Sequence, residues 1–72
     1  MSRRAAIADA QHRRLEAERR AADFHGRADV MDRMGYRASA QALRSQALAA
    51  EDTWSFWDAK LLNLTASARA RA

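Results

Sequence analysis

The 72-residue sequence contains no cysteine and no proline, and it has only two glycines, Gly26 and Gly35. Without cysteine the chain forms no disulfide and has no thiolate with which to bind zinc. Without proline, and with so little glycine, few residues interrupt a helix, and the abundant alanine, arginine, leucine and glutamate favour one. The sequence therefore predicts an all-α protein.

Long apolar runs are also missing. No run approaches the roughly 20 residues that a membrane-spanning helix needs, and the first residues lack the apolar core of a signal peptide. A cytoplasmic protein without membrane insertion is therefore expected. Lysine is scarce as well, because twelve of the thirteen basic residues are arginine. Together with the many alanines, this suggests a bacterial or phage genome rich in GC.

An apolar series with alternating spacings of three and four residues dominates the second half of the chain. It fills every a and d position of four heptads: Ala40, Leu43, Ala47, Ala50, Trp54, Trp57, Leu61, Leu64 and Ala68. Such a seam is typical of a helix that packs lengthwise against another helix, as in a coiled coil. The two tryptophans are its largest members, so small residues are expected opposite them.

A similar series runs through the first half, interrupted only by Arg14. Its members are Ile7, Ala10, Ala17, Ala21, Phe24, Ala28 and Met31. Ser2 is the expected N-cap, and the pattern keeps its phase through Gly26, which predicts one helix up to Met34. The alternative is a break at His25–Gly26, which would leave a separate short helix over residues 27–34. Gly35 then follows as a helix-terminating glycine.

The two series predict an antiparallel two-helix hairpin with coiled-coil-like packing and more than three quarters of its residues helical. The expected bounds are a helix over about 3–34, a turn over about 35–37, a helix over about 38–68 and a frayed tail over 69–72. Folding at the turn sets large residues opposite small ones, as a close-packed core requires. The expected matches are Phe24 with Ala47 and Ala50, Trp54 and Trp57 with Ala17 and Ala21, and Leu61 and Leu64 with Ala10.

Several apolar residues fall outside both series and would be exposed in an isolated hairpin. They are Leu15, Val30, Met34, Leu48, Phe56 and Leu62. A chain this short buries little surface, and exposed apolar clusters usually mark an interface. A homo-oligomer of hairpins that forms a helical bundle is therefore expected. The predicted helix-packing and interface residues are Phe24, Leu43, Trp54, Phe56, Trp57, Leu61 and Leu64.

The formal net charge of +4 raises nucleic acid as a partner. In that reading, the phosphate contacts would come from Arg3, Arg4, Arg13, Arg14, Arg19 and Arg20. Much of the charge, however, is expected to be paired within one helix at i,i+4 spacing. Those pairs are Asp9–Arg13, Glu16–Arg20, Asp23–Arg27 and Asp29–Arg33. No recognition-helix layout or base-reading motif accompanies the arginines.

No catalytic motif or glycine-rich phosphate loop is present in the sequence. His12 with Glu16 and His25 with Asp29 have a spacing that would let each pair contact one metal ion. Helical di-iron bundles, in contrast, use Glu-x-x-His motifs on facing helices, and neither pair reproduces that pattern. Neither an enzyme nor a cofactor or metal is expected. Trp54, Phe56 and Trp57 could stack on bases, but two of the three have the spacing of core residues.

Residues 50–60 read A-E-D-T-W-S-F-W-D-A-K. This segment resembles the pattern A-x-D-x-W-x-aromatic-aromatic-x-A-K in a family of uncharacterised bacterial membrane-associated proteins of unknown function. The matching residues are Ala50, Asp52, Trp54, Ala59 and Lys60, and Phe56 and Trp57 keep the aromatic pair. The resemblance implies a recurring helix-packing segment. It does not imply a membrane location, because this sequence lacks the flanking transmembrane helices of that family.

These features together predict a non-enzymatic helical interaction or assembly protein. It would be a small adaptor, structural or inhibitory protein of phage or mobile-element type that self-associates and docks a larger protein partner. The alternative is a small basic nucleic-acid-binding protein that uses its arginine-rich first helix.

Overall fold

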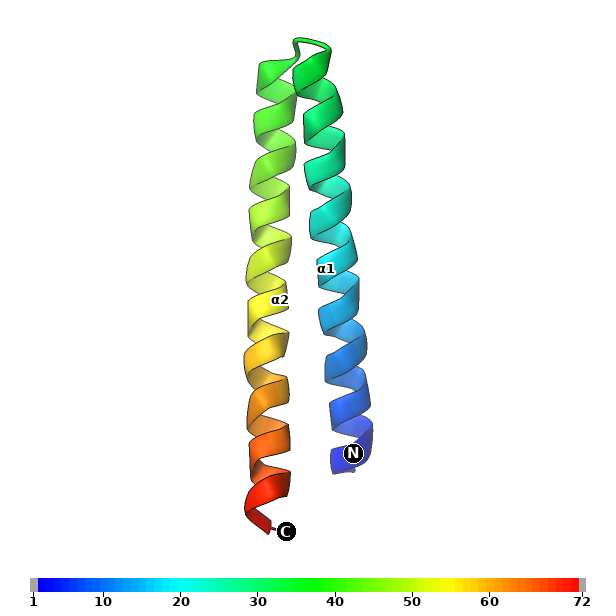
Figure 1. Cartoon of the computed structure of the whole chain (residues 1–72), viewed down its shortest axis with the longest axis vertical. Coiled ribbons are helices and arrows are strands. Elements are labelled where there is room, and N and C mark those ends of the chain that lie inside the picture. Colours follow the sequence, from blue (N-terminus) through cyan, green and yellow to red (C-terminus); the bar gives the residue numbers. More distant parts are fainter. Residues whose placement is uncertain (1, 72) are drawn as a thin grey trace.

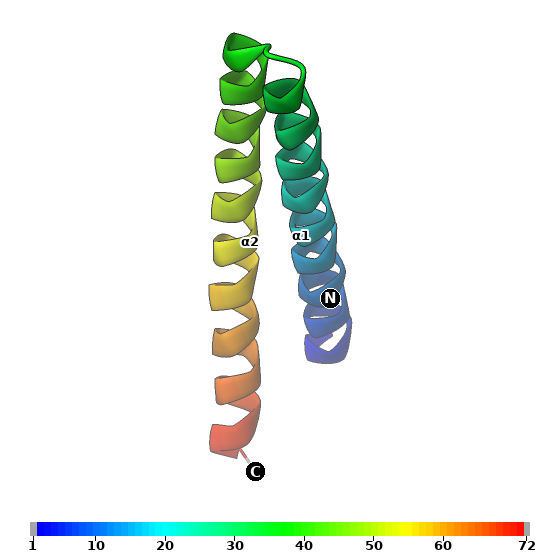
Figure 2. The same ribbon diagram turned by 45° about the horizontal axis from the view of Figure 1, so that its top comes forward.

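The computed structural model describes residues 2–71 of the chain, with side chains over residues 2–66. Two helices, α1 (Arg3–Arg33) and α2 (Arg37–Arg71), lie antiparallel and side by side (Figures 1 and 2). The hairpin measures 55 × 15 × 15 Å, and its described residues include no strand. The predicted all-α helical hairpin is confirmed.

Local signals in the sequence account for the start and the continuity of α1. The Ala5 N–H donates a 3.1 Å hydrogen bond to the Ser2 hydroxyl oxygen, which makes Ser2 the N-cap as predicted. The helix then continues through Gly26 to Arg33, so the alternative of a break at His25–Gly26 is excluded. A Cβ atom added at Gly26 would meet nothing within 4 Å.

Gly35 ends the first helix by adopting a left-handed backbone conformation, with φ +86°. The Tyr36 N–H donates to the Met31 carbonyl at 2.8 Å, and the Gly35 N–H donates to the Asp32 carbonyl at 3.0 Å. These two bonds form a Schellman motif, which satisfies carbonyls that the helix end would otherwise leave without partners. The turn occupies residues 34–36, so α2 begins one residue earlier than predicted.

The far end of α2 differs from the prediction. The helix was expected to end at Ala68 and to be followed by a frayed tail, but the backbone stays helical to Arg71. Residues 69–71 are alanine and arginine, which are both strong helix formers, and no cap or breaker precedes them. The helix therefore extends three residues beyond its predicted end, fraying of the tail stays a prediction, and residue 72 lies outside the described residues.

The buried core of the described residues consists of seven alanines and one leucine. They are Ala10, Ala17, Ala21 and Ala28 in α1 and Ala40, Ala47, Ala50 and Leu61 in α2. All eight belong to the two predicted apolar series. The larger members of those series that the structure leaves half-buried are Ile7, Phe24, Met31, Leu43, Trp54, Trp57 and Leu64. Two helices touch along a narrow line, so only small side chains fit wholly within it and large ones extend past its edges.

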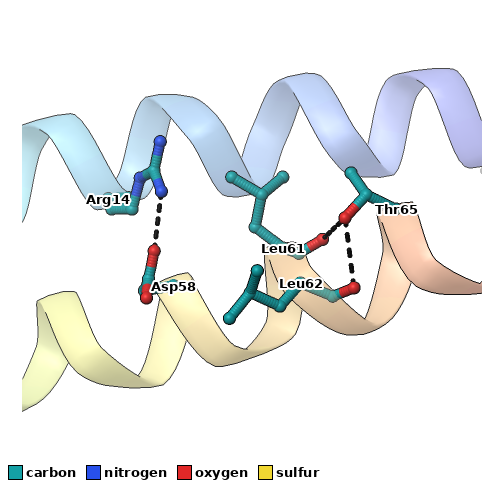
Figure 3. A network of polar contacts seen from close by, with 5 residues as sticks. All are labelled: Arg14, Asp58, Leu61, Leu62 and Thr65. Carbon is teal, nitrogen blue, oxygen red and sulfur yellow. Dashed lines mark hydrogen bonds and ion pairs between the residues drawn. The ribbon is translucent and has the colours of Figure 1, made fainter.

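The alternation between buried and exposed positions is clear at the neighbouring residues Leu61 and Leu62. Leu61 reaches from α2 toward α1 and is 7% exposed, whereas Leu62 remains 63% exposed (Figure 3). One helical turn later the Thr65 hydroxyl donates to the carbonyls of both leucines, at 3.0 and 3.1 Å. The Thr65 hydroxyl group, beside the seam, therefore finds its hydrogen-bond partners within its own helix.

The size of the seam residues changes along the hairpin. Near the turn the seam carries Ala28, Ala40 and Ala47, whose methyl groups permit a close approach of the backbones. Farther from the turn α2 contributes Trp54 and Trp57, which are half-buried at the edges of the seam. The two ribbons lie closer together near the turn than toward the chain ends (Figures 1 and 2).

Contacts between the helices agree with the predicted register. Trp54 lines one surface groove together with Ala21, and Trp57 lines another together with Ala17. The same register brings Arg14 of α1 to Asp58 of α2, with 2.7 Å between a guanidinium nitrogen and a carboxylate oxygen (Figure 3). Large residues of one helix therefore meet small residues of the other.

Replacing the two glycines by alanine is expected to change stability in opposite directions. At Gly26 the added methyl has free space in a helix, so the free energy of unfolding should rise by about 1 kcal/mol. At Gly35 the left-handed conformation disfavours a side chain, so Gly35→Ala should lower it by about 1–2 kcal/mol. Urea unfolding followed by circular dichroism measures both. A destabilised Gly26→Ala variant would contradict a continuous α1.

The alanine seam predicts that Ala17→Trp is destabilising, because Ala17 is 1% exposed and lies beside Trp57. Overpacking of this kind typically lowers the free energy of unfolding by about 1–3 kcal/mol. Ala8→Trp is the matched control, since Ala8 is an exposed alanine on the same helix. Equal thermal midpoints for the two variants would show that Ala17 does not lie in a tight contact.

Candidate interaction faces

The side-by-side helices form one layer with two long faces, one on either side of the alanine seam. Contacts between α1 and α2 assign side chains to each face. The acidic face carries Arg14, Glu18, His25, Asp29, Asp32, Arg44, Glu51, Trp54 and Asp58. The basic–aromatic face carries Asp9, Arg13, Glu16, Arg20, Asp23, Phe24, Arg27, Phe56, Trp57 and Lys60.

An ion pair and a hydrogen bond cross between the helices on the acidic face. Besides Arg14 and Asp58, His25 Nε2 lies 2.7 Å from Glu51 Oε1. All four side chains are 29–48% exposed, and ion pairs in contact with water contribute only about 0–1 kcal/mol each. Their main effect is therefore to favour one register of α1 on α2.

Arg44 joins the two helices near the turn. Its guanidinium contacts Asp29 at 3.2 Å and also pairs with Asp32. The hydrogen bond to Asp32, and then the attraction of both carboxylates, raises the pKa of Arg44 above its ordinary value. Arg44 thus stays charged and holds the start of α2 to the last turns of α1.

These contacts correct part of the predicted charge pairing. The pairs Asp9–Arg13 and Asp23–Arg27 form within α1, at 3.0 and 3.5 Å. The other two predicted pairs are wrong. Glu16 pairs with His12 at 3.0 Å, and Asp29 pairs with Arg44 across the layer. As a result Arg20 and Arg33 have no ion-pair partner among the described residues.

A shallow groove of about 350 Å³ lies at the centre of the acidic face. Its polar lining includes the carboxylates of Glu18 and Glu51 together with His25, and the half-buried Trp54 forms an apolar wall. Glu51 is already paired with His25. Within the described part of the chain, Glu18 has no hydrogen bond or ion pair, so the groove presents one free carboxylate beside an aromatic ring.

The basic–aromatic face is arranged around Trp57. The Arg13 guanidinium lies 5.0 Å and the Lys60 ammonium 5.5 Å from the centre of its ring, and Phe56 meets it edge to face at 5.1 Å. Arg20 lines two adjacent hollows, one beside Phe24 and the other beside Trp57. This face therefore presents cations over an aromatic surface.

The predicted packing residues are divided between these faces rather than gathered in one core. Trp54 lies on the acidic face and Trp57 on the basic–aromatic face. Both are half-buried, and of the seven predicted residues only Leu61 is buried. Phe56 is 60% exposed. The seam itself is therefore closed by alanine, and the aromatic side chains remain available to a partner.

The six arginines predicted to contact phosphate do not share a face. Arg13 and Arg20 lie on the basic–aromatic face, and Arg14 lies in an ion pair on the acidic face. Arg19 is exposed and, two residues after the buried Ala17, it projects from the outer side of α1. Arg3 and Arg4 belong to the first turn of that helix.

Both faces are indicated in the sequence by the residues at the positions that flank the seam in each heptad. In α1 one flanking row reads Glu18, His25 and Asp32, and the other reads Arg13, Arg20 and Arg27. In α2 the corresponding rows read Arg44, Glu51 and Asp58, and Gln46, Thr53 and Lys60. Such flanking positions set partner choice in helical bundles. Local i,i+4 pairing does not indicate Glu18, Glu51 or Lys60, because these positions flank the contact with the other helix.

The chain matches no protein-family model, no curated protein and no solved structure. The resemblance of residues 50–60 to a membrane-associated family stays a prediction. Neither helix, over its described residues, is long and apolar enough to cross a membrane. Among the side chains that the structure describes, no three metal-ligating residues gather as a potential metal site.

Arg13→Ala is expected to be more destabilising than Arg20→Ala. Arg13 contacts both Asp9 and Trp57, and loss of the cation–π contact alone corresponds to about 0.5–1 kcal/mol. Arg20 has no such contact among the described residues, so its replacement should change the free energy of unfolding by less than about 0.5 kcal/mol. Urea unfolding of the two variants tests this order, and equal effects would contradict the arrangement around Trp57.

Proposed function

We propose that the chain is a non-enzymatic, cytoplasmic assembly protein of bacterial or phage type that acts by self-association and docks a larger protein partner. One observation carries this proposal: seven large apolar side chains are 40–63% exposed in the single hairpin. They are Leu15, Val30, Met34, Tyr36, Leu48, Phe56 and Leu62. Leu48 and Leu62 lie fourteen residues apart on the same side of α2, and apolar side chains that gather on one side are typical of an interaction surface.

The composition of the core supports the same proposal. A buried methyl group contributes only about 0.8 kcal/mol, whereas a fully buried leucine or phenylalanine side chain contributes about 1.5–3 kcal/mol. Among the described residues no large side chain is fully buried. A second copy packed on the layer would cover Trp54 or Trp57 and supply the burial that the alanine seam does not.

The shape of the hairpin suits this arrangement. A face 55 Å long and 15 Å wide has a projected area of about 800 Å², which is what each partner typically contributes to a stable protein interface. Two layers packed face to face would make a four-helix bundle. Larger assemblies would follow if both faces are used.

Sedimentation equilibrium at micromolar concentration tests the proposal. The wild-type chain should be at least a dimer, and Leu48→Ser combined with Leu62→Ser should raise the dissociation constant at least tenfold. Ala38→Ser combined with Ala59→Ser is the matched control, because both residues are exposed on α2 and lie outside the apolar set. A wild-type chain that is helical by circular dichroism yet monomeric would reject self-association.

A small basic nucleic-acid-binding protein is the second candidate. It is favoured by Arg13, Arg20 and Lys60, which lie together on one face beside the exposed Phe56. Fluorescence anisotropy with labelled single-stranded DNA or RNA at several salt concentrations separates the candidates. Phosphate binding would give affinity that falls steeply with salt and is lost in Arg20→Ala. The assembly proposal expects no such binding.

A further inference from the structure

We propose that copies of the chain stack through their long faces in a heterologous, head-to-tail arrangement. The acidic face of one copy contacts the basic–aromatic face of the next. This inference rests on the self-association proposed above and specifies its geometry. The contact would place Arg20 of one copy in the groove beside Glu18 and Trp54 of its neighbour.

The charges on the two faces favour this pairing over a symmetric one. With histidine neutral, the acidic face carries five carboxylates and two arginines, a net charge of −3. The basic–aromatic face carries four cations and three carboxylates, a net charge of +1. A symmetric dimer would set like charge against like charge, whereas head-to-tail stacking sets opposite charges together.

Two arginines at the ends of the layer reduce the net charge of the acidic face to −1 and do not change its sign. Arg4 and Arg37 occupy the same heptad positions as the acidic row, but they lie at the two ends of the hairpin. Arg4 is fourteen residues from Glu18, and Arg37 is fourteen residues from Glu51. At 1.5 Å per residue, each separation is about 21 Å along a helix, which is well beyond the physiological screening length of about 8 Å.

Two groups without partners make the contact specific. Glu18 and Arg20 have no hydrogen bond or ion pair among the described residues, although each lines a hollow at the centre of its face. Trp54 forms the wall of the acidic groove and provides a ring against which a guanidinium can stack. One arginine from a neighbouring copy would thus meet a free carboxylate and a free aromatic surface.

Equal spacing of the flanking rows allows further contacts along the helix, in which the neutral His25 adds no charge. Arg13, Arg20 and Arg27 repeat every seven residues, and Glu18, His25 and Asp32 repeat at the same interval. The interval corresponds to about 10.5 Å on both rows, so one row can lie along the other. Each copy then leaves one face free, and such a contact continues beyond a dimer unless the rotation closes a ring.

Charge reversal tests this geometry by sedimentation velocity over a concentration series. Glu18→Lys and Arg20→Glu should each raise the dissociation constant at least tenfold. The double variant Glu18→Lys with Arg20→Glu should return to within about threefold of wild type, because the new cation of one copy then meets the new carboxylate of the next. Raising NaCl from low to high concentration should weaken wild-type association.

Asp52→Lys and Arg19→Glu are the matched controls. Both residues are exposed and belong to neither face, so the same changes of charge should leave association within about twofold of wild type. Circular dichroism of every variant verifies that the helices persist; a variant that loses its helices is replaced by Glu18→Gln or Arg20→Gln, for which partial weakening is expected.

The results distinguish the two proposals. If the wild-type chain is monomeric, self-association is rejected and the stacking with it. If the wild type associates but Glu18→Lys or Arg20→Glu tightens the assembly, copies pair through like faces and head-to-tail stacking is wrong. Failure of the double variant to recover also overturns the stacking while leaving self-association intact.

Discussion

The structure depends on the contact between two helices along a line of alanine methyl groups. Ala17, Ala21 and Ala47 let the backbones approach closely, and that approach leaves no room in the seam for an indole or phenyl ring. Trp54 and Trp57 are therefore displaced to opposite faces of the layer, although both occupy seam positions in the sequence. A hairpin built in this way gains a definite register from its small residues and leaves its large ones half-exposed at the edges of the seam.

The same geometry divides the charged side chains between the two faces. Residues that flank the seam on one side meet their counterparts on the other helix, as Arg14 meets Asp58 and His25 meets Glu51. On the opposite side, cations such as Arg13 lie over Trp57 and do not cross to a carboxylate. A chain with a positive net charge thus forms a layer with one acidic face, which composition alone would not reveal.

The helices, the turn and the alanine seam could be predicted from the sequence because each has a local cause. Apolar spacing gives the helical faces, Ser2 starts α1, and Gly35 with its positive φ ends it. The degree of burial could not be predicted, because periodicity gives the direction of a side chain and not the width of the contact it enters. The prediction of two ion pairs was wrong for a related reason. Spacing of i,i+4 identifies neighbours on one helix only, whereas Asp29 pairs with Arg44 of the other helix.

Charge placement also bears on which assemblies are favourable. Outside the two faces, exposed arginines such as Arg19 and Arg33 project from the outer side of α1. Two hairpins that met edge to edge through α1 would bring these cations together, and their repulsion would oppose that contact. Stacking through the faces leaves the same arginines at the periphery, in water, while it covers the tryptophans. The distribution of alanine, aromatic and charged residues therefore supports the proposed stacking through the faces over an edge-to-edge contact.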